Sequence, residues 1–117
     1  MNETKKIRDI LHTDEFDAFY KSLDDRTVSK YDEAILYLET VYILSTKFIK
    51  KIVNTDLYEM RVSIGYNEYR TMLFAADHDN VIQAKKIFLL NGFLKKSSKD
   101  YDKQIKRAVN ILKELEL

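Results

Sequence analysis

The stretch that decides the fold is LYEMRVSIGYNEYRTMLFA, residues 57–75. In its first half, apolar side chains alternate with Glu59, Arg61 and Ser63, which is the pattern of a half-buried strand. A turn is expected at Gly65, because glycine adopts positive φ without strain. The second half is again rich in aromatic and β-preferring residues. We therefore predict an antiparallel hairpin over residues 57–75.

Helices are predicted on both sides of this hairpin. Asp14 is the candidate N-cap of a short first helix. A longer helix is predicted over residues 25–42, which carry one apolar stripe at helical spacing, and Asp24 or Asp25 could be its N-cap. Residues 105–115 carry a similar stripe, so we expect a C-terminal helix there.

A third strand is predicted from the nearly continuous apolar run at 87–93, which is typical of a central strand covered on both faces. Residues 5–11 fit either a short strand or a helical turn, and the basic stretch 45–51 is assigned to neither. The order is helices, three adjacent strands and a helix. We predict a single α+β domain over residues 1–117.

Composition excludes several classes of protein. The chain has 117 residues, no Cys and a net charge of +1, so it has no thiolate nucleophile and no cysteine zinc site. No apolar run is long enough for a membrane span or a signal peptide, and we expect a cytoplasmic protein. The acidic turn that starts at Asp77 has Phe88 at its twelfth position, where a calcium loop needs Glu. No metal or cofactor is predicted.

Charge is unevenly distributed along the chain. Residues 45–107 hold 13 basic and 7 acidic side chains, whereas residues 1–44 hold 6 basic and 10 acidic ones. The surplus of basic side chains in residues 45–107 would favour binding of a polyanion if the fold gathers these side chains on one face. The alternative is that scattered lysines only keep a small protein in solution.

Three blocks of sequence together resemble one protein family. They are Leu57–Arg61, then Tyr69-Arg70 with Leu73-Phe74, then Leu89–Phe93 followed by Lys95-Lys96. In this order and at this separation they resemble the RelE/HigB superfamily of bacterial and phage toxins, in particular its phage-derived branch. Ile105 and Ala108 of the last helix match as well, and the similarity spans about residues 16–112. The chain departs from the pattern at Met60, where Leu is usual, and at Ser97–Asp100, where Thr and Pro are common.

The resemblance implies a fold and two possible activities. The fold would be a twisted, mainly antiparallel sheet with N-terminal helices packed on one face, a C-terminal helix and a basic concave surface. Many members of the superfamily cut messenger RNA inside the ribosome and are silenced by an antitoxin encoded beside them. Others poison DNA gyrase without cutting RNA.

The two arginines of these blocks suit metal-free RNA cleavage, in which a 2′-hydroxyl attacks the neighbouring phosphate. Arg61 and Arg70 would stabilise the charge of the transition state, and Arg70 matches the best-known phosphate-binding arginine of the superfamily. Each has a structural alternative. Arg61 could pair with Glu59 on a solvated face, and Arg70 shares its side of the strand with Met72, so its stem could pack while its head reaches water.

Further candidates flank the arginines. Lys96 is a catalytic candidate for proton transfer if burial lowers its pKa, and Lys95 is expected to bind RNA beside it. Lys50, Lys51 and Tyr69 are the other predicted RNA-binding residues, the tyrosine by stacking on a base, as Tyr66 and Tyr101 could also do. Either lysine group could instead simply solvate the end of an element. The general base is not identified, because His12 and His78 both lie outside the matching blocks.

Our hypothesis is the toxin of a type II toxin–antitoxin system, acting as a ribosome-dependent mRNA endoribonuclease. The alternative is a non-catalytic binding module of the same fold, such as a gyrase inhibitor. The expected partners are the ribosome, mRNA and an antitoxin with a helix-turn-helix, and the free protein is expected to be a monomer or weak homodimer. The hypothesis requires the two guanidinium groups to converge on a water-accessible hollow instead of being held in internal carboxylate pairs.

Overall fold

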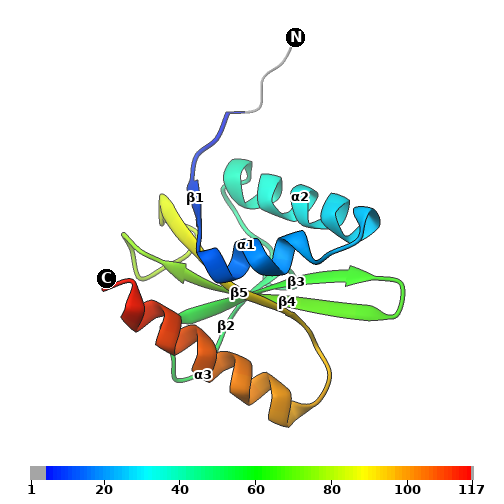
Figure 1. Cartoon of the computed structure of the whole chain (residues 1–117). Coiled ribbons are helices and arrows are strands. Elements are labelled where there is room, and N and C mark those ends of the chain that lie inside the picture. The colour runs from blue at the N-terminus through cyan, green and yellow to red at the C-terminus, as the bar shows by residue number, and fades with distance from the viewer. Residues whose placement is uncertain (1–4, 117) are drawn as a thin grey trace.

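A computed structural model describes residues 5–116. Three helices accompany one five-stranded sheet, whose strand order is β1-β5-β4-β3-β2 (Figure 1). Only the β1–β5 pairing is parallel. The elements are β1 Asp9–His12, α1 Asp14–Lys21, α2 Asp25–Thr40, β2 Ile49–Lys51, β3 Leu57–Ile64, β4 Asn67–Ala75, β5 Lys86–Leu94 and α3 Ser98–Glu114. The predicted α+β fold is confirmed; the predicted domain also includes residues 1–4 and 117, which lie outside the described part.

Helices α1 and α2 cover one face of the sheet, above it in Figure 1. The side chains of Thr13 and Asp24 cap them by accepting hydrogen bonds from backbone N–H groups three residues on. The predicted cap Asp14 is therefore the first helical residue instead, whereas Asp24 is one of the two caps expected for α2. The buried rings of Phe16 and Tyr31 pack in this layer.

The β3–β4 hairpin confirms the prediction for residues 57–75. Its turn has two central residues, Gly65 and Tyr66, and Gly65 has a φ of 58°. Glycine at that position is typical of a type II′ turn, whose twist suits a hairpin. This register sets Arg61 directly opposite Arg70.

Helix α3 packs on the second face of the sheet, below it in Figure 1. Ser97 caps it by accepting a hydrogen bond from the Asp100 N–H at 3.1 Å. Ala108 and Ile111 of α3 pack on Leu90 and Phe93 of β5, which explains why the β5 sequence is apolar on both sides. The face opposite α1 and α2 is therefore partly covered, and only its margins are open.

Two short strands were not assigned by the sequence. Residues 9–12 form β1, which resolves the choice between a strand and a helical turn, and residues 49–51 form β2 at the other edge. In β2 only Ile49 is buried, so the basic stretch carried too little apolar periodicity to predict a strand. The sheet has five strands where three were predicted.

Arg8 joins these layers at the start of β1. It is almost fully buried and donates hydrogen bonds to the backbone carbonyls of Leu38, Val41, Tyr42 and Ile82 at 2.6–2.9 Å. Carbonyls at the C-terminal end of a helix carry partial negative charge, which suits a guanidinium.

Among residues 5–116, no helix has both the length and the apolar character needed to span a membrane.

Candidate functional site

The carboxylate of Glu59 lies at the centre of a polar cluster on the α3 face of the sheet. Arg61, two residues along β3, donates from Nε and Nη2 to Glu59 Oε1 at 3.1 and 3.0 Å. Tyr101, in the first turns of α3, donates its hydroxyl to Oε2 at 2.5 Å. Arg70 comes from β4, and its Nε lies 3.7 Å from the same oxygen. One carboxylate is therefore shared by two guanidinium groups, which leaves the cluster with a surplus positive charge.

The two arginines differ in how far they reach solvent. The Arg61 side chain is 33% exposed, whereas that of Arg70 is 7% exposed. Arg70 Nη1 donates to the Tyr69 carbonyl at 2.9 Å, and its Nε has no hydrogen-bond partner within residues 5–116. A buried donor without a partner is unfavourable. The Arg70 guanidinium therefore keeps unsatisfied hydrogen-bonding capacity on its buried side, next to the Glu59 carboxylate.

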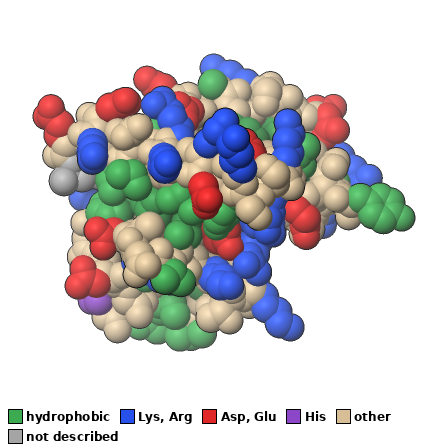
Figure 2. Space-filling view, turned by 90° about the horizontal axis from the view of Figure 1, so that it is seen from below, with side chains coloured by type: hydrophobic (Ala, Val, Ile, Leu, Met, Phe, Trp, Pro, Cys, Tyr) green, Lys and Arg blue, Asp and Glu red, His purple; other side chains and the backbone are tan. Residues whose placement is uncertain are grey.

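This basic hollow lies between the tip of the β3–β4 hairpin and the end of β5. It measures about 370 Å³ and is lined by Tyr66, Asn67, Glu68, Arg70, Leu94, Lys95 and Lys96. The Lys95 N–H donates to the Glu68 carbonyl at 2.7 Å, which fixes the exit of β5 against β4. Figure 2, seen from below, shows Lys and Arg side chains gathered along a recess on this side of the molecule. Three of the predicted cations therefore share one cavity.

Tyr101 connects the Glu59 cluster to this hollow. Lys95 Nζ lies 5.7 Å from the centroid of the Tyr101 ring, a cation–π distance. Burial, and then the hydrogen bond to Glu59, raises the pKa of the Tyr101 hydroxyl above its ordinary value. The hydroxyl therefore stays protonated at neutral pH and remains a donor to the carboxylate.

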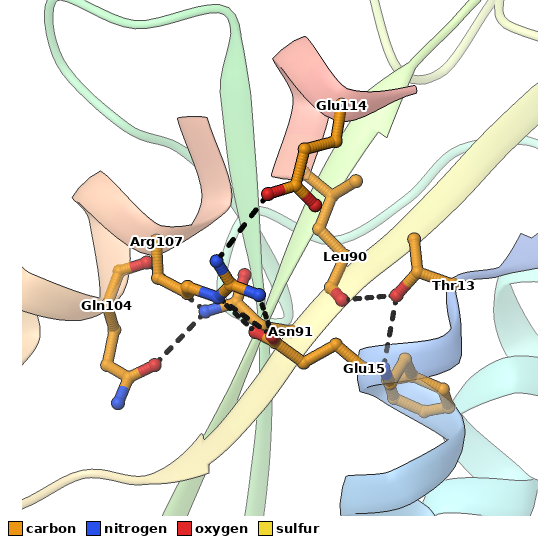
Figure 3. Close-up of polar contacts among 8 residues, drawn as sticks. Thr13, Glu15, Leu90, Asn91, Gln104, Arg107 and Glu114 are labelled. Atoms are coloured by element: carbon orange, nitrogen blue, oxygen red, sulfur yellow. Dashed lines mark hydrogen bonds and ion pairs between the residues drawn. The ribbon is translucent and has the colours of Figure 1, made fainter. Parts of the chain in front are cut away.

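A second polar network holds α3 in place (Figure 3). Asn91 of β5 is buried and donates from Nδ2 to the backbone and side-chain oxygens of Gln104 at 3.2 and 3.1 Å. Arg107 donates to the Glu15 carboxylate of α1 and lies 3.9 Å from Glu114. These contacts join α1, β5 and α3, and so they fix where Tyr101 stands relative to Glu59.

The remaining predicted residues are divided between the two faces. Lys50 is the cross-strand partner of Glu59 and so shares its face. Lys51 points to the other face, where its Nζ lies 5.0 Å from the Tyr58 ring centroid. Tyr69 also faces away from Arg70, with its ring packed against Phe19 and Tyr31. Lys51 and Tyr69 therefore do not join the cluster.

Two expectations for the site need correction. Both guanidinium groups approach Glu59, but they do not open onto one hollow, because Arg70 lines the basic hollow whereas Arg61 lines a separate cavity beside α2. Arg61 is also hydrogen-bonded to Glu59, which was the structural alternative, and Arg70 is nearly buried with its stem among apolar residues. Lys96 is exposed, so the burial on which its role in proton transfer depended is absent.

From the sequence, Glu59 and Tyr101 were not expected to lie together, and Tyr101 was considered only as a ring that could stack on a base. Glu59 was considered only as a partner of Arg61, although it shares the face of both arginines. Tyr101 is separated from Glu59 by 42 residues, so only the packing of α3 brings it there. His12 contacts Asp17, and His78 accepts from the Asn80 N–H in the β4–β5 connection. Within the described residues, no three His, Asp or Glu side chains form a potential metal site.

The comparison of the amino-acid sequence with models of known protein families identifies one family. The model of the family described as "Phage derived protein Gp49-like (DUF891)" matches residues 18–113. No curated protein and no solved structure matches the chain. The matched range includes all residues of the Glu59 cluster and of the basic hollow.

Proposed function

Because the chain belongs to the Gp49-like family of phage-derived proteins, a toxin-like family, we propose that it is the toxin of a type II toxin–antitoxin system and acts as a ribosome-dependent mRNA endoribonuclease. Its site of action would be the cytoplasm, where the ribosome presents mRNA as a single strand. Its second partner would be an antitoxin, a helix-turn-helix protein encoded beside it. The closeness of two arginines and two lysines at one end of the sheet is the observation that carries the proposal.

That arrangement supplies the charge that the reaction needs. When a 2′-hydroxyl attacks the neighbouring phosphate, the transition state carries more negative charge than the substrate, and fixed guanidinium groups stabilise it. Arg61 and Arg70 face each other across adjacent strands, and Lys95 and Lys96 follow at the end of the next strand. Lys95 and Lys96 would hold the RNA backbone while the arginines bind the reacting phosphate. Lys50, the cross-strand partner of Glu59 on β2, would contact the RNA on the other side of the arginines.

Glu59 would accept the proton. Its carboxylate is held between the arginines by Arg61 and Tyr101, so a phosphate bound there would bring the 2′-hydroxyl near it. In the proposed step the 2′-oxygen gives its proton to Glu59 and bonds to phosphorus, and the P–O5′ bond breaks. The departing 5′-oxygen takes a proton from water, which leaves a 2′,3′-cyclic phosphate and a 5′-hydroxyl. The Arg61–Glu59 hydrogen bonds must open for this, and Arg61 is the more exposed of the two arginines.

The proposal is tested by expressing the chain and mapping mRNA ends with primer extension and ribosome profiling. We expect growth arrest with new 5′-hydroxyl ends in the ribosomal A site. Arg61→Ala should abolish the cleavage, and Arg26→Ala, a matched change at an exposed arginine of α2, should not. Growth arrest with intact messages and broken DNA would instead favour a gyrase inhibitor. Absence of growth arrest would contradict the toxin proposal itself.

A further inference from the structure

Tyr66 occupies the tip of the β3–β4 hairpin with no packing partner of its own. Its relative exposure is 106%, the largest among the exposed large hydrophobic residues. It is the second central residue of the two-residue turn, between the paired residues Ile64 and Asn67. A type II′ turn needs glycine only at its first central position and accepts other residues at the second, so the turn permits an aromatic ring there, and neither the turn nor burial requires one.

The ring lies at the rim of the basic hollow. The charged residues that line this hollow with it are Arg70, Lys95, Lys96 and Glu68, so three cations face one carboxylate. The Glu68 carboxylate accepts a hydrogen bond from the Ser63 hydroxyl on the neighbouring strand. The hollow therefore combines a net positive charge with an aromatic face that is open to solvent.

The backbone holds these groups in a fixed relation. Residues 61–64 of β3 pair with residues 67–70 of β4 up to the turn, and the Lys95 N–H bonds the Glu68 carbonyl. Arg70 and Lys95 belong to the two strands that meet at this point, where Tyr69 pairs with Leu94. Little conformational entropy would be lost on binding a ligand that spans both parts.

We infer that Tyr66 and the basic hollow form a binding site for a single-stranded RNA nucleotide, with the base stacked on the Tyr66 ring and the phosphate on Arg70, Lys95 and Lys96. This inference rests on the proposed function, because it names how the mRNA substrate is held beside the reacting phosphate. An aromatic ring next to cations is the arrangement that binds single strands with little base preference, because every base has a π-face. A duplex would not fit this description, since its bases are already stacked.

The test compares RNA with and without bases by fluorescence anisotropy of the purified protein. The probes are a labelled 2′-O-methyl uridine dodecamer, which 2′-hydroxyl attack cannot cleave, and an abasic ribose-phosphate oligomer of the same length. Tyr66→Ala should weaken binding of the uridine probe about 5- to 150-fold, the range expected for one lost base stack. It should leave binding of the abasic probe unchanged. Tyr66→Phe keeps the ring and should bind like the wild type.

The controls separate stacking from other causes. Tyr42→Ala removes another exposed tyrosine, 57% exposed, and should leave both affinities unchanged. Equal binding of the uridine probe by Tyr66→Ala and the wild type would overturn the inference, as would an equal loss for both probes. Failure of the proposed function would look different: the stacking difference would be present while expressed wild-type protein leaves messages intact.

Discussion

At the scale of single residues, Glu59 is the group on which the candidate site depends. Its carboxylate is the acceptor for Arg61 and Tyr101 and lies within ion-pair distance of Arg70. Glu59→Gln keeps the shape but leaves two guanidinium groups facing each other without an anion. We expect the free energy of unfolding, measured by urea denaturation, to fall by about 2 kcal/mol. Breaking a fully buried ion pair costs more than this, but Arg61 is partly exposed, so water screens part of the loss.

The same variant should also lose mRNA cleavage, because the proposed proton acceptor is gone. Glu33→Gln is the matched control: it removes a carboxylate from the Lys30–Glu33 pair on α2, whose side chains are 51% and 70% exposed. This control should change stability much less and keep cleavage. A Glu59→Gln protein as stable and as active as the wild type would remove Glu59 from the site.

The raised pKa of the Tyr101 hydroxyl predicts that the stability of the protein depends on pH. Burial first, and then the bond to Glu59, raises the pKa of this hydroxyl in the folded protein above the ordinary value near 10. Tyrosine is neutral when protonated, so the folded state holds this proton more tightly than the unfolded state does. The stabilisation is complete below the unfolded pKa and is lost as pH rises towards the folded one.

The measurement is the slope of unfolding free energy against pH between about pH 9 and 11. In wild-type protein the free energy should decrease with pH, and Tyr101→Phe should make the slope shallower. Part of the slope should persist in this variant, because burial also raises the pKa of Tyr31. Tyr42→Phe changes an exposed ring and should keep the wild-type slope. A slope unaffected by Tyr101→Phe would mean that α3 does not hold the hydroxyl against Glu59.

At the scale of elements, the close approach of α1 to β5 depends on Gly92. A Cβ atom built at this position would lie 2.4 Å from two ring carbons of Phe19, so any larger residue must displace the ring. We expect Gly92→Ala to lower the free energy of unfolding by about 2 kcal/mol, as overpacking usually does. This packing also gives a physical reason for the glycine in the third matching block.

A double variant tests that reason. Phe19→Leu makes room at the contact, so Gly92→Ala should cost much less in that background than in the wild type. Thermal or urea unfolding of the four proteins gives the coupling energy directly. If the two losses simply add, the contact between α1 and β5 is not what requires glycine.

How well the sequence predicted an element depended on where the information lay. The β3–β4 hairpin was predictable because alternation and a turn glycine are local signals, and its two-residue turn also fixes Arg61 opposite Arg70. Strand β2 was not predictable, because its three residues, of which only one is buried, are too few to show an alternating pattern of apolar and polar side chains. The Glu59–Tyr101 contact depends on how α3 docks, which local patterns do not contain. The sequence therefore predicted the cations of the site and Glu59 as a possible partner of Arg61, and only the fold revealed that this carboxylate also contacts Arg70 and Tyr101.

At the scale of the whole molecule, the two faces of the sheet have different roles. Helices α1 and α2 cover one face with aromatic packing, while α3 covers only part of the other and leaves the basic hollow at its margin. The net charge of the chain is only +1. The proposed binding of RNA would therefore depend on where the cations lie and not on the total charge.

This difference between local and total charge predicts a specific salt dependence. Each phosphate contact to a single strand contributes a slope of about −0.7 to the plot of log affinity against log salt. Removing both Lys95 and Lys96 by substitution with Ala should make that slope shallower by about 1.4 if each binds one phosphate. Lys21→Ala with Arg26→Ala removes the same charge from exposed positions of α1 and α2, on the opposite face, and should leave the slope almost unchanged. Equal effects of the two double variants, measured with the 2′-O-methyl uridine probe, would show that RNA responds to the overall charge of the protein, and the basic hollow would then lose its assignment as the RNA site.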